Sequence, residues 1–525
     1  MYELTQEERM ILSMVDDLCV DVVAERAAAI DEEDEFPQDI YELFVEQGLF
    51  ALAYGEEHGG VEVSMHCWVQ VIERIARESP AVALMILISA IGSDALVFSG
   101  SAEQQRAILP ALAAGEAKIC FALTEPNAGS DISAISTTAL PDGDGYTING
   151  GKIFITNGAV GDWFTVFARV VEDGQSKPSC FIVHRDTPGL VIGRKEDKMG
   201  LRGSVTSQLY FENMHVGPEA VVGEVGDGFA IAHHTLNRGR LAVAALATGV
   251  TAASLAAAAA YAKERIQFGK HIADLQAIRF MLADMEITLE ASRLLLDQAA
   301  SAFGGDIQTM MKTASVAKVY CSEAAVKAAE TAVQIFGGYG LCKDYPVERY
   351  YRDAKSFTIV EGTSQVQRSL IAKIGAEGIL GGVRRRRAAH AKARRAAAMD
   401  IAVCIKQTVD TEAEVGVDAE GRALTEGQDA RHRPVRASSP WSGPCSWRRS
   451  TAATCPSCAS AATRPCRRCA MRCRWGRRRV TWSTTRRSPR RTLPSRRACW
   501  PPRWNACRPI SCWAAASRPT RRARR

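Results

Sequence analysis

The sequence has few of the features that mark secreted or membrane proteins. Its N-terminus, MYELTQEERM, has no basic segment followed by an apolar run, so we expect no secretory signal peptide. The most apolar window, AVALMILISAIGS (81–93), is expected to be too short to cross a bilayer. The first 430 residues contain only seven scattered cysteines, which indicates reduced core thiols rather than a disulfide framework. These absences predict a soluble, cytoplasmic protein without a membrane span.

The last part of the chain lacks whole classes of residue. Residues 431–525 contain no Lys, Asp or Glu and almost no Leu, Ile or Val, but they hold 26 Arg, nine of the 16 Cys and seven of the nine Trp. Because the net charge of the whole chain is +6, residues 1–430 together carry −20. So few aliphatic residues cannot bury enough apolar surface to offset chain entropy. We therefore expect an acidic folded protein followed by a disordered, very basic tail.

Three patterns divide the first 380 residues. Residues 1–116 have apolar residues at helical spacing and predict a helical domain. Residues 117–227 consist of short runs rich in Thr, Val, Ile and Phe between turn clusters such as PDGDG, which predicts an antiparallel β domain. Residues 228–380 form long, Ala-rich helical segments with short connections, typical of a helical bundle. The predicted fold class is therefore α+β multidomain, with a helical, a β and a second helical domain.

Capping boxes indicate where helices begin. In this signal, Ser or Thr at the helix start is followed three residues later by Glu or Gln. It occurs at three places: Thr5 with Glu8, Ser101 with Gln104, and Ser364 with Gln367.

A lone carboxylate, Glu361, stands just before the third of these helix starts, in IVEGTSQVQR (359–368). Gly362 allows the backbone to turn sharply or to approach a ligand closely. We expect Ile359 and Val360 to desolvate the carboxylate in part, which would raise its pKa toward the range of a general base. The alternative is that this glutamate is only an electrostatic cap of the helix.

Two stretches of the β domain carry weaker signals. In CFALTEPNAGSD (120–131), a turn is expected to expose backbone N–H groups and the hydroxyls of Thr124 and Ser130, although an ordinary loop would have the same sequence. In GKIFITNG (151–158), Phe154 and Thr156 alternate along one strand. These two side chains could contact a planar ring or form an ordinary core pair.

Two stretches of the C-terminal helical region have similar signals. In KERIQFGK, Arg265 and Gln267 end a helix at a Phe-Gly break, where they could meet a phosphate. In QIFGGYG, the glycines permit close backbone approach. Each signal is weak when it is taken alone.

In combination and in this order, TEPNAGSD, ITNG, ERIQFGK, QIFGGYG and VEGTSQVQR closely resemble the acyl-CoA dehydrogenase family of flavoenzymes. The resemblance covers residues 1 to about 380 without a visible gap. It implies FAD as cofactor, an acyl-CoA substrate of fatty acid β-oxidation, and electron-transfer flavoprotein as electron acceptor. Glu361 matches the base that takes the α proton while a hydride leaves the neighbouring carbon for flavin N5, giving trans-2-enoyl-CoA. The backbone N–H of Glu361 and the flavin ribityl chain would bind the thioester oxygen.

The resemblance also assigns roles to further positions and implies no metal. Residues expected to lie against FAD are Phe121, Leu123, Thr124, Gly129, Ser130, Phe154, Thr156, Thr363 and Gln365. The pyrophosphate and adenosine side would be held by Arg265, Gln267 and Phe268, and the FAD of a neighbouring subunit would be reached by Gln334 and Gly338. The expected substrate contacts are Ser130, Asn237, Arg240, Val360 and Gly362. Sharing of a cofactor between subunits implies an oligomer, usually a homotetramer built as a dimer of dimers.

Three positions depart from the pattern of many relatives. Phe154 stands where many have Trp, which keeps an aromatic face, and Asn237 stands where some have Asp. Val360 stands where several straight-chain enzymes have Tyr, which predicts a wider pocket that tolerates branched or bulky short acyl groups. Two other functions remain open: an acyl-CoA oxidase that passes electrons to oxygen, and a catalytically silent flavin-bound scaffold whose basic tail binds nucleic acid.

The sequence after residue 380 does not continue the resemblance to acyl-CoA dehydrogenases. A basic linker (381–398) leads to residues 399–430, which resemble the N-terminal strand and loop of the electron-transfer flavoprotein beta subunit. The Arg-, Pro-, Ser- and Trp-rich vocabulary of 431–525 is typical of GC-rich DNA read in a wrong frame, so we expect two adjacent genes joined by a frameshift. The rival interpretation is a zinc or nucleic-acid module built on CPSC, CRRC and Cys473. The short spacing between the cysteine pairs and the absence of Lys make this zinc or nucleic-acid module the weaker prediction.

Overall fold

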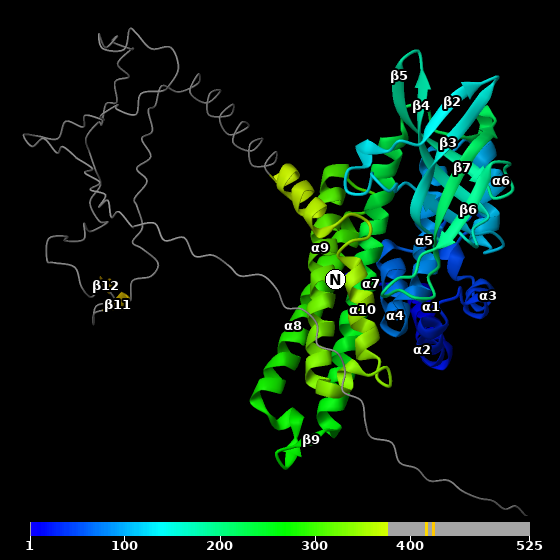
Figure 1. The fold of residues 1–525 in the computed structure, drawn as a ribbon. Coiled ribbons are helices and arrows are strands. Elements are labelled where there is room, and N and C mark those ends of the chain that lie inside the picture. Colours follow the sequence, from blue (N-terminus) through cyan, green and yellow to red (C-terminus); the bar gives the residue numbers. More distant parts are fainter. Residues whose placement is uncertain (1, 376–414, 418–422, 426–525) are drawn as a thin grey trace, which may run out of the picture. The chain divides into compact units, whose positions relative to one another are not determined.

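The computed structural model describes residues 2–375, 415–417 and 423–425 (Figure 1). The chain separates into two compact units, Met1–Met399 and Asp400–Arg525. In the second unit the described residues form one antiparallel pair, β11 (Val415–Val417) with β12 (Ala423–Thr425). The predicted basic linker, most of the segment that resembles the beta subunit, and the Arg-rich tail with its cysteine pairs lie outside the described residues.

The N-terminal region is helical, as predicted. Its α-helices are α1 (Gln6–Leu18), α2 (Ala24–Glu33), α3 (Gln38–Glu46), α4 (Met65–Glu78), α5 (Pro80–Ser99) and α6 (Ala102–Ala113). The capping boxes that begin at Thr5 and Ser101 are confirmed. In each, the cap hydroxyl accepts from the backbone N–H three residues on, and the side chain of that residue accepts from the cap N–H.

The central region is a single β-sheet in the order β6-β7-β3-β2-β4-β5-β8, with β1 paired to β4 outside this path. The strands are β1 (Ile119–Ala122), β2 (Thr138–Asp142), β3 (Gly145–Thr156), β4 (Trp163–Glu172), β5 (Gln175–His184), β6 (Leu190–Lys195), β7 (Thr206–Val216) and β8 (Val221–Val222). The predicted antiparallel pairing is confirmed for the other pairs of this sheet but not for two pairs at β4, where β1 and β2 both pair in parallel. The chain between them, residues 123–137, leaves the sheet and returns to the same strand, and it carries TEPNAGSD.

The C-terminal region is a bundle of long helices. They are α7 (Gly228–Glu264), α8 (Gln276–Ala302), α9 (Ile307–Phe336) and α10 (Val347–Phe357), followed by a helix that begins at residue 364 and continues to the end of the described segment at 375. A short antiparallel pair, β9 (Ile266–Gln267) with β10 (Lys270–His271), follows α7. Helices α7, α8 and α9 run side by side (Figure 1). The many alanines of α7 and α9 let these helices pack closely.

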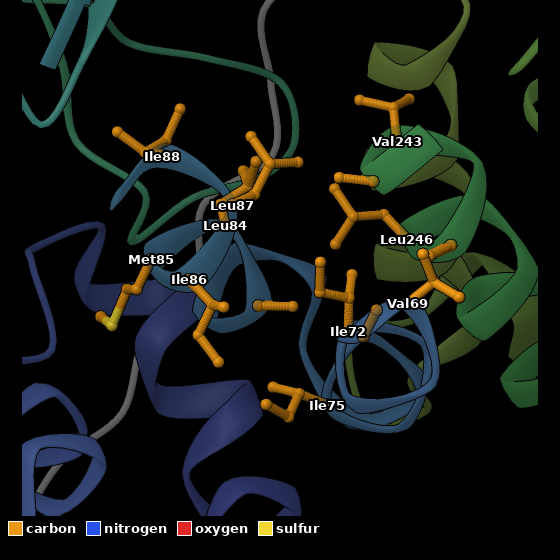
Figure 2. Packing of buried hydrophobic residues seen from close by; sticks show 14 of the residues in the cluster. Val69, Ile72, Ile75, Leu84, Met85, Ile86, Leu87, Ile88, Val243 and Leu246 are labelled. Atoms are coloured by element: carbon orange, nitrogen blue, oxygen red, sulfur yellow. The ribbon is translucent and has the colours of Figure 1, made fainter. Parts of the chain in front are cut away.

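The helical regions share one hydrophobic core. Figure 2 shows its centre, where side chains of α4, α5 and α7 meet; the labelled residues include Ile72, Ile86 and Leu246, each fully buried. Helix α5 is apolar on every face because it also packs against the sheet, and the Thr165 hydroxyl of β4 donates to the Gly92 carbonyl at 2.6 Å. This packing fixes the sheet against the helices at the edge where the candidate site lies.

The length argument against a membrane span was wrong. The window 81–93 belongs to α5, which has 20 residues, and both α5 and α7 are long and apolar enough to span a bilayer. Within the described part of the chain, however, 89% of the most apolar window of α5 and 78% of that of α7 are buried by other parts of the protein. Such burial is typical of core helices.

Candidate active site

A cavity of about 190 Å³ lies where the β domain meets α5, α7 and the loop before residue 364. Ten of the predicted site residues line it: Phe121, Leu123, Thr124, Gly129, Ser130, Phe154, Thr156, Arg240, Glu361 and Gly362. The sequence did not single out Ile88 and Ile91 of α5 or His233 of α7, which also line it. Residues from five regions of the sequence therefore meet around one small space.

The segment between β1 and β2 is held in place by a buried ion pair. Lys152 of β3 donates through Nζ to Glu125 Oε1 at 2.7 Å and to the Leu123 carbonyl at 3.1 Å. The Glu125 carboxylate also accepts from both the N–H and the hydroxyl of Ser136 and from the N–H of Thr137. Burial would raise the pKa of Glu125, but Lys152 and these donors offset it and lower that pKa to about 2. Burial lowers the pKa of Lys152 to about 8, against the pull of Glu125, so a pKa of about 2 for Glu125 and of about 8 for Lys152 leaves both charged at neutral pH.

The wall formed by the β domain offers an open surface for a flat group. The pairing of β3 with β7 is irregular between Lys152 and Ile155, and Phe154 has a positive φ of 61°. As a result Phe154 is 59% exposed and lines the cavity with Thr156, while Ile155 between them packs into the core. Among the described residues, apart from the two chain neighbours of Gly129, no atom lies within 4 Å of the position that a Cβ at Gly129 would occupy. An exposed aromatic ring, an open glycine and nearby hydroxyls fit the planar ring system of the predicted FAD.

The loop that carries Glu361 has an unusual backbone. Glu361 has a φ of 53° and Gly362 a φ of 91°. A side chain in the left-handed region costs about 1–3 kcal/mol and persists only where the surroundings impose it. The predicted capping box was wrong here: Thr363, not Ser364, caps the following helix by accepting from the Val366 N–H at 3.2 Å. Gln367 instead donates to the carbonyls of Glu361 and Gly362, at 3.0 and 3.3 Å, so it holds the loop rather than the cap.

The Glu361 carboxylate is buried against α7. Its Oε2 is shielded from solvent and has no hydrogen-bond partner among the described residues. It lies against Gly239, where an added Cβ would come within 2.9 Å of the carboxyl carbon. The expectation that Ile359 and Val360 bury this carboxylate was wrong, because they are 54% and 38% exposed. The absence of a side chain at Gly239 makes the space for it.

Two buried cations face this carboxylate. Burial raises the pKa of Glu361, and the charges of Arg240 and Lys318 oppose that rise in part. Arg240 donates to Asn237 Oδ1 at 2.7 Å, and burial lowers its pKa to about 10. Lys318, on α9, donates to the Gly362 carbonyl at 2.7 Å, and burial lowers its pKa to about 8. The predicted rise in the pKa of Glu361 therefore comes from burial, and the two neighbouring cations make that rise smaller.

Four predicted residues lie near this cavity but not on its wall. Asn237 is fully buried behind it and contacts Arg240. Thr363 caps the helix, and Gln365 is exposed on the surface of that helix. Val360 is not a lining residue, so the idea that it widens the pocket remains a prediction from sequence.

The other predicted cofactor residues lie far away. Arg265, Gln267, Phe268 and Gly338 line a hollow of about 520 Å³ at the C-terminal end of α7. Gln334 lines a separate hollow between α8 and α9. At 1.5 Å per residue, Arg265 is about 37 Å along α7 from Arg240. Because this exceeds the length of one FAD molecule, the two groups cannot bind the same FAD within one chain.

Sequence reasoning missed three contributors to the site. Gly239 and Lys318 lie within Ala-rich helical segments, and nothing local distinguishes a glycine or lysine there from an ordinary one. The Glu125–Lys152 pair had a signal, because a lysine in an apolar strand needs a buried partner. The acid in TEPNAGSD was the nearest candidate.

Comparison with known proteins agrees with this geometry. Three family models match in succession: the acyl-CoA dehydrogenase N-terminal domain at residues 5–116, the middle domain at 120–214 and the C-terminal domain at 226–375. An acyl-CoA dehydrogenase of Bacillus subtilis (strain 168) is 42% identical over 372 residues, which are 70% of this chain and 98% of that protein. A cyclohex-1-ene-1-carbonyl-CoA dehydrogenase of Geobacter metallireducens is 39% identical and covers 71% of this chain and 99% of its own.

Solved structures give the same result. Butyryl-CoA dehydrogenase from Megasphaera elsdenii has a TM-score of 0.68 at 36% identity, covering 71% of this chain and 99% of its own. A chain from the work on the electron transferring flavoprotein of Acidaminococcus fermentans has a TM-score of 0.68 at 37% identity, with coverage of 71% and 98%. An acyl-CoA dehydrogenase from Bacillus anthracis complexed with FAD has a TM-score of 0.68 at 30% identity, with coverage of 72% and 68%. The chain therefore belongs to the acyl-CoA dehydrogenase family, FAD-dependent oxidoreductases that act on acyl-CoA.

Proposed function

We propose that this enzyme converts an acyl-CoA thioester to the trans-2-enoyl-CoA, with Glu361 as the base that removes the α proton. The observation that carries the proposal is the buried carboxylate of Glu361, a residue that lines the cavity and whose Oε2 has no hydrogen-bond partner among the described residues. A buried acceptor without a donor is unfavourable unless a ligand or substrate completes it. A C–H proton delivered to that oxygen would do so.

The chain supplies the groups that such a proton transfer needs. The carboxylate must be ionised to act, and after it takes the proton the neutral acid is favoured by burial. The backbone N–H of Glu361 makes no hydrogen bond within residues 2–375, so it is free to bind the thioester oxygen and to stabilise the charge that develops there. Phe154, Thr156 and Thr124 would hold FAD. When bound, FAD supplies the acceptor for the hydride that leaves the β carbon.

The test is the replacement of Glu361 by glutamine, which keeps the shape and removes the base. We expect the variant to bind flavin but to lose bleaching of the flavin by acyl-CoA by roughly 10²–10⁴-fold, the usual contribution of a general base. Glu25→Gln, an exposed glutamate on α2, is the matched control and should react like the wild type. Undiminished bleaching in Glu361→Gln would rule out this role. Because the base must be ionised, wild-type kcat should rise with pH through a pKa above the ordinary glutamate value.

For the acyl group, we propose branched or bulky short chains. Support comes from Val360, which is smaller than the Tyr of several straight-chain enzymes, and from the similar cyclohex-1-ene-1-carbonyl-CoA dehydrogenase. A panel of acyl-CoA thioesters with an artificial acceptor would test it. Equal or better turnover of straight medium chains would count against the proposal.

Electron-transfer flavoprotein is the acceptor that we propose, because one similar chain comes from work on that protein. Reduction of purified electron-transfer flavoprotein under acyl-CoA would support it. Hydrogen peroxide formed in stoichiometric yield would instead identify an oxidase.

We also propose a homo-oligomer, a tetramer by analogy. Phe280, Ile287 and Leu294 are 60%, 66% and 59% exposed and recur every seven residues along α8, so they form one apolar stripe. The hollow that contains Arg265 is about 37 Å along α7 from Arg240, which lines the cavity with Glu361, so it can contact cofactor only in another subunit. Light scattering on the Leu294→Glu variant should show a smaller particle than the wild type. An unchanged mass would argue against this interface.

A further inference from the structure

A lysine is completely buried beneath the loop that carries the base. Lys318 lies on α9 with none of its surface exposed, and its nearest helical neighbours on the same face, Ser315 and Ser322, are also fully buried. Burying an ammonium group costs several kcal/mol unless hydrogen bonds and opposite charge compensate it. A lysine in the middle of an Ala-rich helix therefore needs an explanation.

The contacts of Lys318 lead only to the Glu361 loop. Its Nζ donates to the Gly362 carbonyl at 2.7 Å, and within residues 2–375 it forms no ion pair within 4 Å of a carboxylate. The negative charge that acts on it most strongly is that of Glu361. Lys318 therefore donates a hydrogen bond to the backbone next to Glu361, and it interacts with the Glu361 carboxylate only through its charge.

The loop that carries Glu361 has a backbone conformation that neighbouring residues must hold in place. Glu361 has a φ of 53°, a conformation that its surroundings must maintain. Two side chains bind the two carbonyls that directly follow this strained torsion: Lys318 at Gly362, and Gln367 at both Glu361 and Gly362. Without the lysine, the amide of Gln367 is the one remaining side-chain donor to these carbonyls in the described part of the chain.

We propose that Lys318 is a positioning residue for the reaction: it holds the Gly362 carbonyl so that Glu361 keeps its left-handed conformation, and its charge keeps the carboxylate ionised until the proton is taken. The inference rests on the proposed role of Glu361 as base. According to this inference, a buried residue on α9 helps to set the conformation and the charge of Glu361, although it lies 43 positions earlier in the sequence.

Other charged groups near Glu361 must be considered for any pH effect. On α7 these are Arg240 and His233, and burial lowers the pKa of His233, so it is neutral at pH 7. On α9, Glu323 also acts on Lys318, but it is paired with Arg368 of the last helix at 2.5 Å. Lys373 of that helix acts on His233. Of this group, Arg240 and Lys318 are the ones that act on Glu361.

The experiment replaces Lys318 by methionine in the holoenzyme. Methionine keeps the length and apolar stem of lysine but removes the donor and the charge. Because no carboxylate is left in an ion pair without its partner, we expect the variant to fold with a Tm equal to or above that of the wild type. Its kcat should fall about tenfold with KM changed less than twofold, since proton transfer and not binding is affected. Removal of this cation should raise the Glu361 pKa further, because the Lys318 charge opposes the rise caused by burial.

The pKa can be read without turnover. The infrared band of the protonated carboxyl, taken as the difference between each enzyme and the same enzyme with Glu361→Gln, is titrated against pH. Lys312→Met, an exposed lysine on the same helix, is the matched control and should leave the band, kcat and Tm unchanged. Lys318→Arg keeps the positive charge, so it should bring the Glu361 pKa closer to the wild-type value than it brings kcat. Lys318→Gln, which keeps a shorter donor without the charge, gives a second variant with the pKa rise predicted for methionine.

The outcomes separate the two proposals. Glu361→Gln that reacts like the wild type would refute the proposed function. If Glu361→Gln is inactive while Lys318→Met and Lys318→Gln have the wild-type kcat and carboxyl pKa, only the role of Lys318 is overturned. A fall in Tm with unchanged kcat per bound flavin would also overturn it, because that result identifies a purely structural lysine.

Discussion

Replacing Gly239 by alanine tests whether the Glu361 carboxylate reacts from its present position, in the space that the missing side chain of Gly239 leaves on α7. The added Cβ would lie 2.9 Å from the carboxyl carbon of Glu361 and closer still to Oε2. Carbon atoms in ordinary contact are about 3.5–4.0 Å apart, so the carboxyl group must retreat by at least about half an ångström. The atoms in the way belong to the end of a flexible side chain, so the fold can accept the change by turning Glu361 away.

The size of the effect follows from that rotation. Holding a side chain about 30° away from a rotamer costs on the order of 0.5–1.5 kcal/mol. If the present position is the reactive one, kcat should fall roughly twofold to tenfold. Stability should change in the opposite direction, because alanine in a helix interior is about 0.5–1 kcal/mol more favourable than glycine. The expected result is a slower enzyme with an equal or higher Tm and unchanged flavin content.

Gly249 on the same helix is the matched control. A Cβ there would lie 2.9 Å from the Ala76 Cβ and from the Arg77 nitrogen and closer still to the Glu73 carbonyl, all on α4. The backbone of a packed helix cannot turn aside, so Gly249→Ala should destabilise the protein by about 1–3 kcal/mol. Its kcat per bound flavin should stay at the wild-type value. The reasoning fails if Gly239→Ala lowers Tm as Gly249→Ala does, or if Gly239→Ala keeps the full wild-type kcat.

Two other changes test the supports of the cofactor site. Lys152→Met leaves the buried Glu125 unpaired and should cost about 3–5 kcal/mol in urea unfolding at pH 7, whereas Lys327→Met, which removes an exposed pair with Glu330, should cost less than about 0.5 kcal/mol. The pKa of Glu125 is lowered to about 2 in the wild-type protein, so its ionised form contributes stability above the unfolded pKa near 4.3, and this stability is lost as pH falls toward 2. The loss of unfolding free energy in Lys152→Met should therefore become smaller in acid. A loss that does not depend on pH would contradict the ion pair. Arg265→Ala should weaken flavin retention in the oligomer, measured as free flavin after gel filtration, although Arg265 is about 37 Å along α7 from Arg240 of the cavity; full retention would mean that its hollow does not serve a cofactor.

Local patterns in the sequence determined the order of the domains and located Glu361, the proposed base. Helical periodicity and turn clusters predicted the helical, β and helical regions, and the capping boxes at Thr5 and Ser101 set two helix starts correctly. The motif around Glu361 identified the family and located the carboxylate in a loop before a helix. Such features depend on residues a few positions apart, so they can be read without knowledge of the fold.

Only the tertiary structure decided what surrounds the base. The expected neighbours Ile359 and Val360 are exposed, while the carboxylate is buried by Gly239, 122 positions earlier, and its loop is held by Lys318 and Gln367. The parallel pairing of β1 and β2 with one strand and the distance of Arg265 from the cavity were equally invisible in the sequence. Burial and charge at a site depend on which helices pack together, and that packing is set by the whole core rather than by residues adjacent in the chain.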